Sequence, residues 1–565
     1  MKKGKLVVGV VMLYLIVAMG IYCNKMNMDG NVDNDTVDEV KEEESVDISS
    51  ALEETQEGVI VAKDPNTDII SRYALPSLER MNAQEQEEYV NNLQVIKRIR
   101  QLGLQETDFL NPENVISNIE EKLRPLDEIY YNNGKKITFE GTTSQELQQV
   151  IDNNPNGVID IYSNSIELSN TIILHDNITL NGNGVKFIGS GLKYGFLAEN
   201  ASNVYIGDIY IDGGMEYGIY LIDCKNIKLV GNEINECIQK AICMVGETEG
   251  FILSDNKMSD NRAGALHIAG DASIGLIESN SVEDTYGTSN MMAGIVFTSD
   301  NPKNKRDIWD NFDDLHIGSY RESLFEQIKA PHNIIVRNNR VSHCNSSGIY
   351  SDGAYSCIVI GNEVKQNDKE GMCLDHGTFG FYLKGNVFEE NGQRSRQTDD
   401  DLQLDFVLDF GRMEDGTAIS KLPGISLDNT AYNILEDNMI INNYGGGIKM
   451  VRTTVRTVIL KNVIRDNNKG QNDIYHFFGI EIGAAPSGIE NSVMDFTPSY
   501  ENIVCRNIIT GDHYSGVFIA EECYVNDVFD NVIMDSQAFG VEAISHKFNS
   551  IINNRTNCGV RNEFG

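Results

Sequence analysis

Basic residues are scarce in this chain. Its 565 residues include 46 lysines and arginines against 84 aspartates and glutamates, a formal net charge of −38 at pH 7. A field of this sign repels nucleic acid and anionic membrane surfaces, so it argues against nucleic-acid partners. It also disfavours a polyanionic substrate, unless metal ions or local basic residues screen the charge.

Several short motifs are absent as well. The ten cysteines are scattered and form no C-x-x-C pair, which argues against a disulfide framework and favours buried thiols in a repetitive core. The chain has no H-E-x-x-H, no nucleophile elbow and no basic patch rich in aromatic residues. The sequence therefore offers no motif of the zinc proteases or of the serine hydrolases.

The N-terminus has the composition of a targeting segment. Three lysines within the first five residues precede an apolar run from Leu6 to Tyr22. Residues 1–23 are therefore predicted to be a signal anchor, or a signal peptide if they are cleaved. The rest of the chain is then expected on the extracellular face of the cell membrane, or secreted.

Two segments separate this terminus from the main domain. Residues 24–72 are acidic and poor in aromatic residues, and are expected to form a disordered spacer. Residues 73–132 carry a helical pattern, which predicts a stalk or cap of short helices. Thr143 and Glu146 then form a capping-box pattern ahead of an apolar stripe, so one amphipathic helix is predicted to cover the N-terminal end of the main domain.

A repeat of 23 or 24 residues occupies most of the chain. It is marked by an asparagine, and a few longer intervals equal one repeat plus an insertion. The marker asparagines are Asn232, Asn256, Asn280, Asn339, Asn362, Asn386, Asn438, Asn462, Asn507, Asn531 and Asn554. Because one repeat cannot bury its own apolar face, the repeats must stack around a shared core. An asparagine that recurs at one bend can form a ladder of side-chain hydrogen bonds.

A second marker predicts the strands. It is a small residue followed by an apolar–x–apolar triplet, as in "GIYS" at 348, "GMCL" at 371 and "GISL" at 424. Short strands broken by glycine and asparagine predict an all-β solenoid of parallel strands over residues 133–565, after a short helical region. This pattern resembles the right-handed parallel β-helix of the pectin-lyase-like superfamily. Two interruptions predict long, functional loops near 300–331 and 392–423.

Outward positions of the marker strands are predicted to form columns. In each triplet the x residue and the residue two later face solvent, and neighbouring coils stack about 4.8 Å apart. One column then contains Asp352, Asp375 and Asp428 on three consecutive coils. Like charges on adjacent strands destabilise a sheet, so a shared proton, a metal ion or nearby cations must offset them.

The three aspartates suit two kinds of chemistry. In a glycoside hydrolase, one carboxyl protonates the leaving oxygen and another attacks or activates water, with no cofactor. Adjacent rungs suit a retaining enzyme, and rungs two coils apart suit an inverting one. In a uronate lyase or C5-epimerase, the same aspartates would bind Ca²⁺ while a neighbouring base removes the C5 proton.

The resemblance extends to individual motifs. Polygalacturonases of this superfamily carry N-T-D, D-D, G-H-G and R-I-K on successive coils. Similar positions here read "SDG" at 351–353, "LDHG" at 374–377, "LDN" at 427–429 and "IKMVR" at 448–452. The stretch "LDH" is also similar to the D-P-H motif of mannuronan epimerases. The resemblance implies a polysaccharide substrate, with His376, Lys449 and Arg452 beside the catalytic aspartates.

Four further residues are candidates for substrate binding. Tyr350 is expected to face outward and stack on a sugar ring. Arg394 and Arg396 lie in the second insertion, and Glu481 neighbours Lys449 on the next coil, where the two can also form a plain salt bridge. The sequence leaves three functions open: a glycoside hydrolase, a Ca²⁺-dependent lyase or epimerase, and a non-catalytic surface protein that binds glycan. It does not indicate the oligomeric state.

Overall fold

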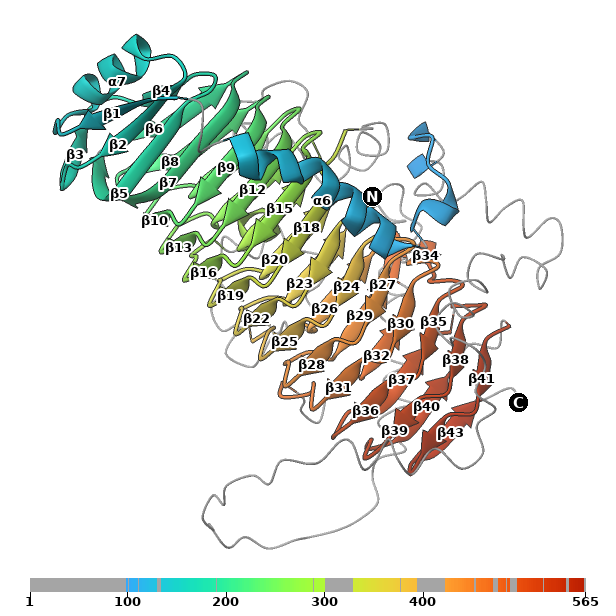
Figure 1. The fold of residues 1–565 in the computed structure, drawn as a ribbon. Helices are drawn as coiled ribbons and strands as arrows, with labels where there is room; N and C mark the ends of the chain where they lie inside the picture. The colour runs from blue at the N-terminus through green and yellow to red at the C-terminus, as the bar shows by residue number, and fades with distance from the viewer. Residues whose placement is uncertain are drawn as a thin grey trace, which may run out of the picture. The chain divides into compact units, whose positions relative to one another are not determined.

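Short parallel strands, three to a coil in most repeats, wind the chain into a β-solenoid (Figure 1). The structure is a computed structural model, and it describes residues 98–99, 101–109, 111–129, 134–189, 191–287, 289–299, 329–375, 377–393, 422–451, 454–470, 476–483, 485–487, 495–521, 523–544 and 548–562. All of these belong to one of the chain's two compact units, Asn66–Gly565. The predicted targeting segment 1–23 and spacer 24–72 lie outside them. No helix in the described part of the chain combines the length and apolarity needed to cross a membrane.

One strand of each coil joins a 14-stranded parallel sheet, which we call sheet 1. Its strands, in order along the sheet, are β4 (Ile172–Leu174), β6 (Leu192–Glu199), β8 (Met215–Ile222), β11 (Ile242–Val245), β14 (Leu266–Ala269), β17 (Ile295–Thr298), β20 (Ile349–Asp352), β23 (Met372–Asp375), β26 (Ile425–Asp428), β29 (Ile448–Val451), β32 (Ile480–Ile482), β37 (Ser515–Ile519), β40 (Phe539–Ala543) and β43 (Gly559–Asn562).

The other two strands of each coil form two further parallel ladders, joined where β5 and β7 run through both. Sheet 2 contains β1 (Lys135–Phe139), β2 (Gly157–Ile161), β5 (Thr179–Gly189), β7 (Ser202–Asp212), β9 (Lys225–Val230), β12 (Glu249–Ser254), β15 (Ser273–Glu278), β18 (His332–Arg337), β21 (Ile358–Ile360), β24 (Tyr382–Lys384), β27 (Ile434–Glu436), β30 (Val458–Leu460), β35 (Ile503–Cys505), β38 (Asp527–Phe529) and β41 (Ser550–Ile552).

Sheet 3 adds β3 (Ser165–Leu168), β10 (Glu233–Asn235), β13 (Lys257–Ser259), β16 (Ser281–Glu283), β19 (Arg340–Ser342), β22 (Glu363–Lys365), β25 (Val387–Glu389), β28 (Met439–Ile441), β31 (Val463–Arg465), β36 (Ile508–Thr510), β39 (Val532–Ile533) and β42 (Arg555–Thr556). The remaining elements are η2 (Glu106–Phe109), α6 (Pro112–Ile129), α7 (Ser144–Asn153), η3 (Asn290–Met292) and the antiparallel hairpin of β33 (Ala485–Ser487) and β34 (Asp495–Thr497).

The core fills the space between the three sheets. Inward side chains of successive coils form one continuous apolar cluster, with Phe187, Phe251, Phe297 and Phe388 among its fully buried members. Nine cysteines in the described residues are free, and all but Cys558 are buried. The predicted all-β parallel solenoid is therefore confirmed, and eight of the nine described thiols are buried, five of them in this core.

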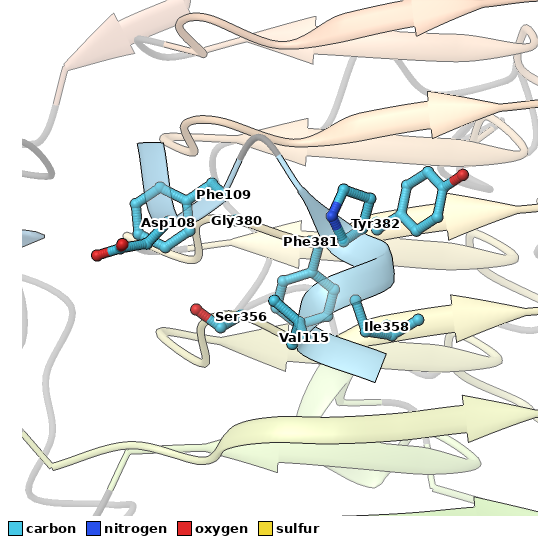
Figure 2. A pocket seen from close by; sticks show the side chains of 9 residues that line it. Asp108, Phe109, Val115, Ser356, Ile358, Gly380, Phe381 and Tyr382 are labelled. Carbon is cyan, nitrogen blue, oxygen red and sulfur yellow. The ribbon is translucent and has the colours of Figure 1, made fainter. Parts of the chain in front are cut away.

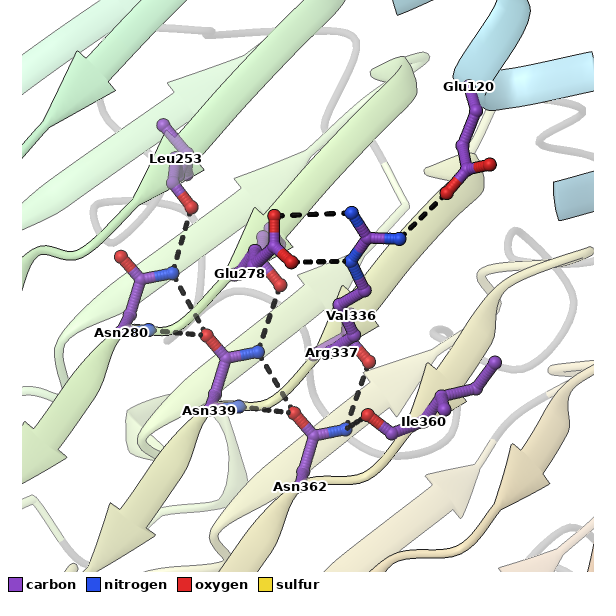
Figure 3. A network of polar contacts seen from close by, with 10 residues as sticks. Glu120, Leu253, Glu278, Asn280, Val336, Arg337, Asn339, Ile360 and Asn362 are labelled. Atoms are coloured by element: carbon purple, nitrogen blue, oxygen red, sulfur yellow. Dashed lines mark hydrogen bonds and ion pairs between the residues drawn. The ribbon is translucent and has the colours of Figure 1, made fainter. Parts of the chain in front are cut away.

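The predicted asparagine ladder runs through the bend between sheets 2 and 3 (Figure 3). Asn339 Nδ2 donates to Asn362 Oδ1 (2.9 Å), and the Asn339 backbone N–H donates to the same oxygen (2.9 Å). Asn280 bonds Asn339 in the same way across 59 positions of sequence. The ladder therefore keeps its register across the first predicted insertion. Most of the residues of both predicted insertions lie outside the described residues.

Two helices cover parts of the solenoid. Helix α7 has the predicted capping box of Thr143 and Glu146 and packs its buried Leu147 and Ile151 into the first coils. Helix α6 instead lies along the side, over β12, β15 and β18 (Figure 1). The prediction for this segment was a stalk or cap of short helices; α6 covers the outer face of sheet 2, which is apolar. Arg337 links the two by an ion pair with Glu120 (2.7 Å; Figure 3).

Candidate functional site

Three aspartates end consecutive strands of sheet 1. Asp352 closes β20, Asp375 closes β23 and Asp428 closes β26. Asp352 pairs with Asp375 in the register of the first two strands, and the register of β23 and β26 carries the column on to Asp428. The structure thus brings the three residues into one column, which we call the aspartate column, with rungs about 4.8 Å apart.

The aspartate column is buried, which corrects the expectation that it faces solvent. Asp352, Asp375 and Asp428 are only 1%, 6% and 6% exposed. Tyr350, expected to stack on a sugar, is 3% exposed and packs in a cluster with Met291; its hydroxyl makes a long hydrogen bond (3.4 Å) to Asp375 Oδ2. Strand alternation identifies the face on which a side chain lies, but not whether other segments cover that face.

A threonine ties together the turns that follow these strands. The Thr378 hydroxyl donates to the carbonyl of Asp375 (2.7 Å) and accepts from the N–H of Gly353 (3.0 Å). The N–H of Gly377 donates to the carbonyl of Asn429 (2.8 Å). Because these bonds join three coils, the backbone that carries the aspartate column is fixed on all three rungs.

An arginine from far upstream reaches the same turn. Arg98 Nη1 donates to the carbonyl of Gly377 (3.0 Å), and the guanidinium lies 5.6 Å from the centre of the Phe379 ring. Burial lowers the pKa of Arg98 to about 10, while Tyr355 and Asp352 oppose that shift. The aspartate column therefore has a neighbouring cation of the kind that its like charges require.

No feature of the sequence identifies Arg98, because it lies 279 positions before Gly377 in an ordinary helical stretch. Its Nε and Nη2 atoms have no hydrogen-bond partner among the described residues, although the side chain is 2% exposed. An unsatisfied buried donor costs about 1–3 kcal/mol. Packing within the described residues therefore does not by itself account for an arginine at this position.

Phe109 contacts the residues that follow Gly377, namely Phe379 and Gly380. Figure 2 shows a pocket where the upstream segment meets the solenoid, lined by Asp108, Phe109, Pro112, Val115, Ser356, Ile358, Gly380, Phe381 and Tyr382. The Phe109 ring packs edge-on against Phe379, with centroids 5.3 Å apart. Gly380 has φ +67°, and a Cβ at this position would lie 2.5 Å from the Phe109 ring, so the contact requires glycine. We call residues 98–129 the brace.

Lys449 and Glu481 lie on the two coils after Asp428. They pair in the register of β29 and β32, and Lys449 Nζ lies 3.4 Å from a carboxylate oxygen of Glu481, with both side chains about a quarter exposed. The salt bridge considered from the sequence is therefore present. The remaining predicted site residues lie outside the described residues; they are His376, Arg452, Arg394 and Arg396.

A resident metal ion would need several ligands that converge on one point. Within the described ranges, no group of three or more histidine, cysteine, aspartate or glutamate side chains is arranged to hold a metal ion. A Ca²⁺ site formed by Asp352, Asp375 and Asp428 therefore remains a prediction of the lyase hypothesis.

Comparison with known families gives one match. The model described as "Right handed beta helix region" matches residues 113–282 and 194–397, which together span half of the chain. A comparison with curated proteins finds no match.

Solved structures with a similar fold have diverse roles. The A-module of mannuronan C-5 epimerase AlgE6 from Azotobacter vinelandii is 14% identical, with 75% of this chain and 96% of that chain covered and a TM-score of 0.44. The catalytic domain of a GH87 α-1,3-glucanase in complex with tetrasaccharides is 11% identical (75% and 66% covered, TM-score 0.42). PfbA, a surface adhesin of Streptococcus pneumoniae, is 11% identical (74% and 91%, TM-score 0.38). Likenesses this distant concern the fold and say nothing about activity.

Proposed function

Because the chain belongs to the right-handed β-helix family, we propose that it is a carbohydrate-active protein, and specifically a polysaccharide-degrading glycoside hydrolase. The family accounts for the fold, whereas the reaction must be argued from the site. The observation that carries the proposal is the aspartate column: Asp352, Asp375 and Asp428 stand on consecutive coils and are almost fully buried.

Burial and like charge disfavour ionisation of all three carboxyl groups at once. One therefore keeps a proton and can donate it to the leaving glycosidic oxygen, while another is ionised and attacks the anomeric carbon or activates water. Adjacent rungs, about 4.8 Å apart, are close to the separation of about 5–5.5 Å in retaining enzymes. Asp352 and Asp428, two coils apart, are close to the upper end of the range of inverting enzymes.

Neighbouring groups give the aspartates different surroundings. The Tyr350 hydroxyl orients Asp375, and the charge of Arg98 favours the ionised form of Asp352. Both contacts favour an ionised carboxyl, so in this proposal Asp352 or Asp375 is the base or nucleophile, and another aspartate of the column is the acid. Lys449 positions the substrate from the next coil, together with the predicted His376 and Arg452.

The principal test measures two products at once. The full chain is incubated with neutral and acidic polysaccharides, with Ca²⁺ or with chelator, and both reducing ends and the ultraviolet absorbance of unsaturated uronate are recorded. A hydrolase produces reducing ends without absorbance. Asp375→Asn is expected to lower turnover by about 10²–10⁴-fold, the contribution of a positioned acid or base.

The matched control is Asp530→Asn, an exposed turn residue with φ +55° that asparagine adopts equally well. It should keep full turnover. Absorbance that disappears with chelator would overturn the hydrolase in favour of the Ca²⁺-dependent lyase. If neither product forms and the sugar composition of the polymer does not change, the remaining hypothesis is a non-catalytic surface protein that binds glycan. The extracellular location and the membrane attachment through residues 1–23 are part of the same proposal.

A further inference from the structure

Four aromatic residues gather on the outer face of sheet 1, beyond the aspartate column. His476 and Phe478 precede β32, Tyr514 precedes β37, and Phe518 lies within β37. The rings of Phe478 and Phe518 are stacked, with centroids 4.4 Å apart and planes inclined by 10°. His476 stacks on Tyr514 at 4.0 Å, and Phe478 meets Tyr514 edge-on. We call these four residues the aromatic shelf.

The shelf differs from the column in its exposure. All four rings are partly exposed, whereas the aspartates are buried. Phe518 has inward neighbours, Val517 and Ile519, that belong to the core, so its own ring stands on the outside of the sheet. Several apolar ring faces held together at a surface are typical of a binding site, because a ligand that covers them removes apolar area from water.

Polar pairs border the shelf within the same column of sheet 1. The register runs from Lys449 through Glu481 and Phe518 to Glu542 and Arg561. Lys449 is paired with Glu481 at 3.4 Å, and Arg561 with Glu542 at 3.0 Å. These side chains can exchange hydrogen bonds with hydroxyl groups of a ligand, and each cation already has a carboxylate beside it.

The charge at the shelf selects against acidic ligands. Burial lowers the pKa of His476 below its ordinary value, so the ring is neutral at neutral pH. The bordering ion pairs Lys449–Glu481 and Arg561–Glu542 carry no net charge, so no unpaired cation among them attracts a uronate carboxylate, and the chain as a whole, at −38, repels it. A neutral sugar ring meets no such penalty, because its apolar face stacks on the aromatic rings and its hydroxyl groups reach the polar pairs.

We propose that the aromatic shelf is a binding subsite for a neutral polysaccharide, which lies along the solenoid axis from the shelf to the aspartate column. Phe478 stands just before the strand two coils beyond Asp428, and Phe518 stands three coils beyond it, roughly 10–14 Å at about 4.8 Å per coil. A glycan with one ring on the shelf is therefore long enough to place a linkage over the coils that carry the column. This proposal rests on the proposed function, and it narrows the substrate to uncharged sugars.

Affinity electrophoresis tests the shelf without any need for turnover. The full chain is run through gels that contain a neutral polysaccharide (β-glucan, xylan, galactomannan or α-glucan) or an acidic one (polygalacturonate or alginate). Retardation is expected in at least one neutral gel and in neither acidic gel. The double variant F478L/F518L, which keeps apolar volume but removes both rings, should weaken that binding about tenfold.

The matched control is Tyr524→Leu, which removes one ring of an edge-on pair with Tyr500 in the turns that lead into sheet 2. It should bind as the parent chain does. Retardation only in acidic gels, in no gel, or equally for parent and F478L/F518L would overturn the shelf. Binding without release of reducing ends would support the subsite proposal and contradict the hydrolase proposal. Hydrolysis with the same KM in F478L/F518L as in the parent would support the hydrolase proposal and contradict the subsite proposal.

Discussion

At the scale of single residues, His513 takes the place of an asparagine in a ladder of side-chain hydrogen bonds and makes that ladder sensitive to pH. A second ladder runs through Asn367, Asn391, Asn443 and Asn467, each side chain bonded to the next. His513 replaces the next rung, where its Nε2 accepts from the backbone N–H of Asn467 (3.1 Å). Burial lowers the pKa of His513 from 6.5 to about 4, because a charged ring would be desolvated and could not accept that bond.

This predicts an acid-sensitive rung. The folded chain keeps His513 neutral, whereas the unfolded chain binds a proton below pH 6.5. Stability is therefore lost as the pH falls from 6.5 towards 4, by up to about 3 kcal/mol. The variant H513N replaces Nε2 with an amide oxygen that does not titrate. Urea unfolding at pH 7 and at pH 4.5 should show a smaller loss for H513N than for the parent; parallel losses would contradict the assignment.

The residues of the columns could be predicted from the sequence, because a repeat of 23 or 24 positions aligns them without any knowledge of the fold. The second ladder carried the same signal, since its asparagines follow those of the first by five positions, as Asn367 follows Asn362. The burial of Asp352 and Tyr350 could not be predicted. The surroundings of Tyr350, for example, include Met291, and the approach of that segment leaves no periodic signal in the sequence.

At the scale of elements, the brace connects a helical segment to the candidate site. Two of its contacts lie in the turn that follows Asp375: Arg98 on the carbonyl of Gly377 and Phe109 on Gly380. Further along the solenoid, Glu120 pairs with Arg337. The brace therefore holds the turn that follows Asp375, and a change at Phe109 or Gly380 should reach the aspartates without any substitution among them.

A pair of glycines tests the brace. Gly380→Ala places a Cβ 2.5 Å from the Phe109 ring at φ +67°, whereas Gly385→Ala has a similar φ of +61° with no atom within 4 Å. Both substitutions cost about 1 kcal/mol for the left-handed backbone. Only G380A should also weaken the contact between the brace and the solenoid. Faster hydrogen exchange in α6 and lower turnover would show this effect. Equal exchange in G380A and G385A would show that the Phe109 contact does not hold the segment.

The helical character of α6 and the capping box of α7 could be predicted, because both depend on local patterns. The position of α6 along sheet 2 could not. It is determined by an apolar outer face that includes Ile252, Ile274 and Ile335, and the sequence of a parallel strand, apolar on both sides, resembles that of a strand buried in any core.

At the scale of the whole molecule, the net charge predicts that stability depends on salt. A chain of charge −38 repels itself, and the range of that repulsion shrinks from about 30 Å at 0.01 M salt to about 8 Å at 0.15 M. The midpoint of thermal unfolding should therefore rise by a few degrees between these concentrations of NaCl. CaCl₂ at equal ionic strength separates screening from binding. A much larger rise with Ca²⁺ would indicate a cation site, and no rise with either salt would contradict the electrostatic argument.

The asparagine ladder has a consequence for how such a chain can evolve. Asn280 and Asn339 are neighbouring rungs 59 positions apart, Asn386 and Asn438 are 52 apart, and Asn462 and Asn507 are 45 apart. The number of coils therefore does not depend on the length of the connections between them. Descendants of this chain can lengthen, shorten or exchange those connections and so alter what they recognise, while Asp352, Asp375 and Asp428 inherit the same alignment unchanged.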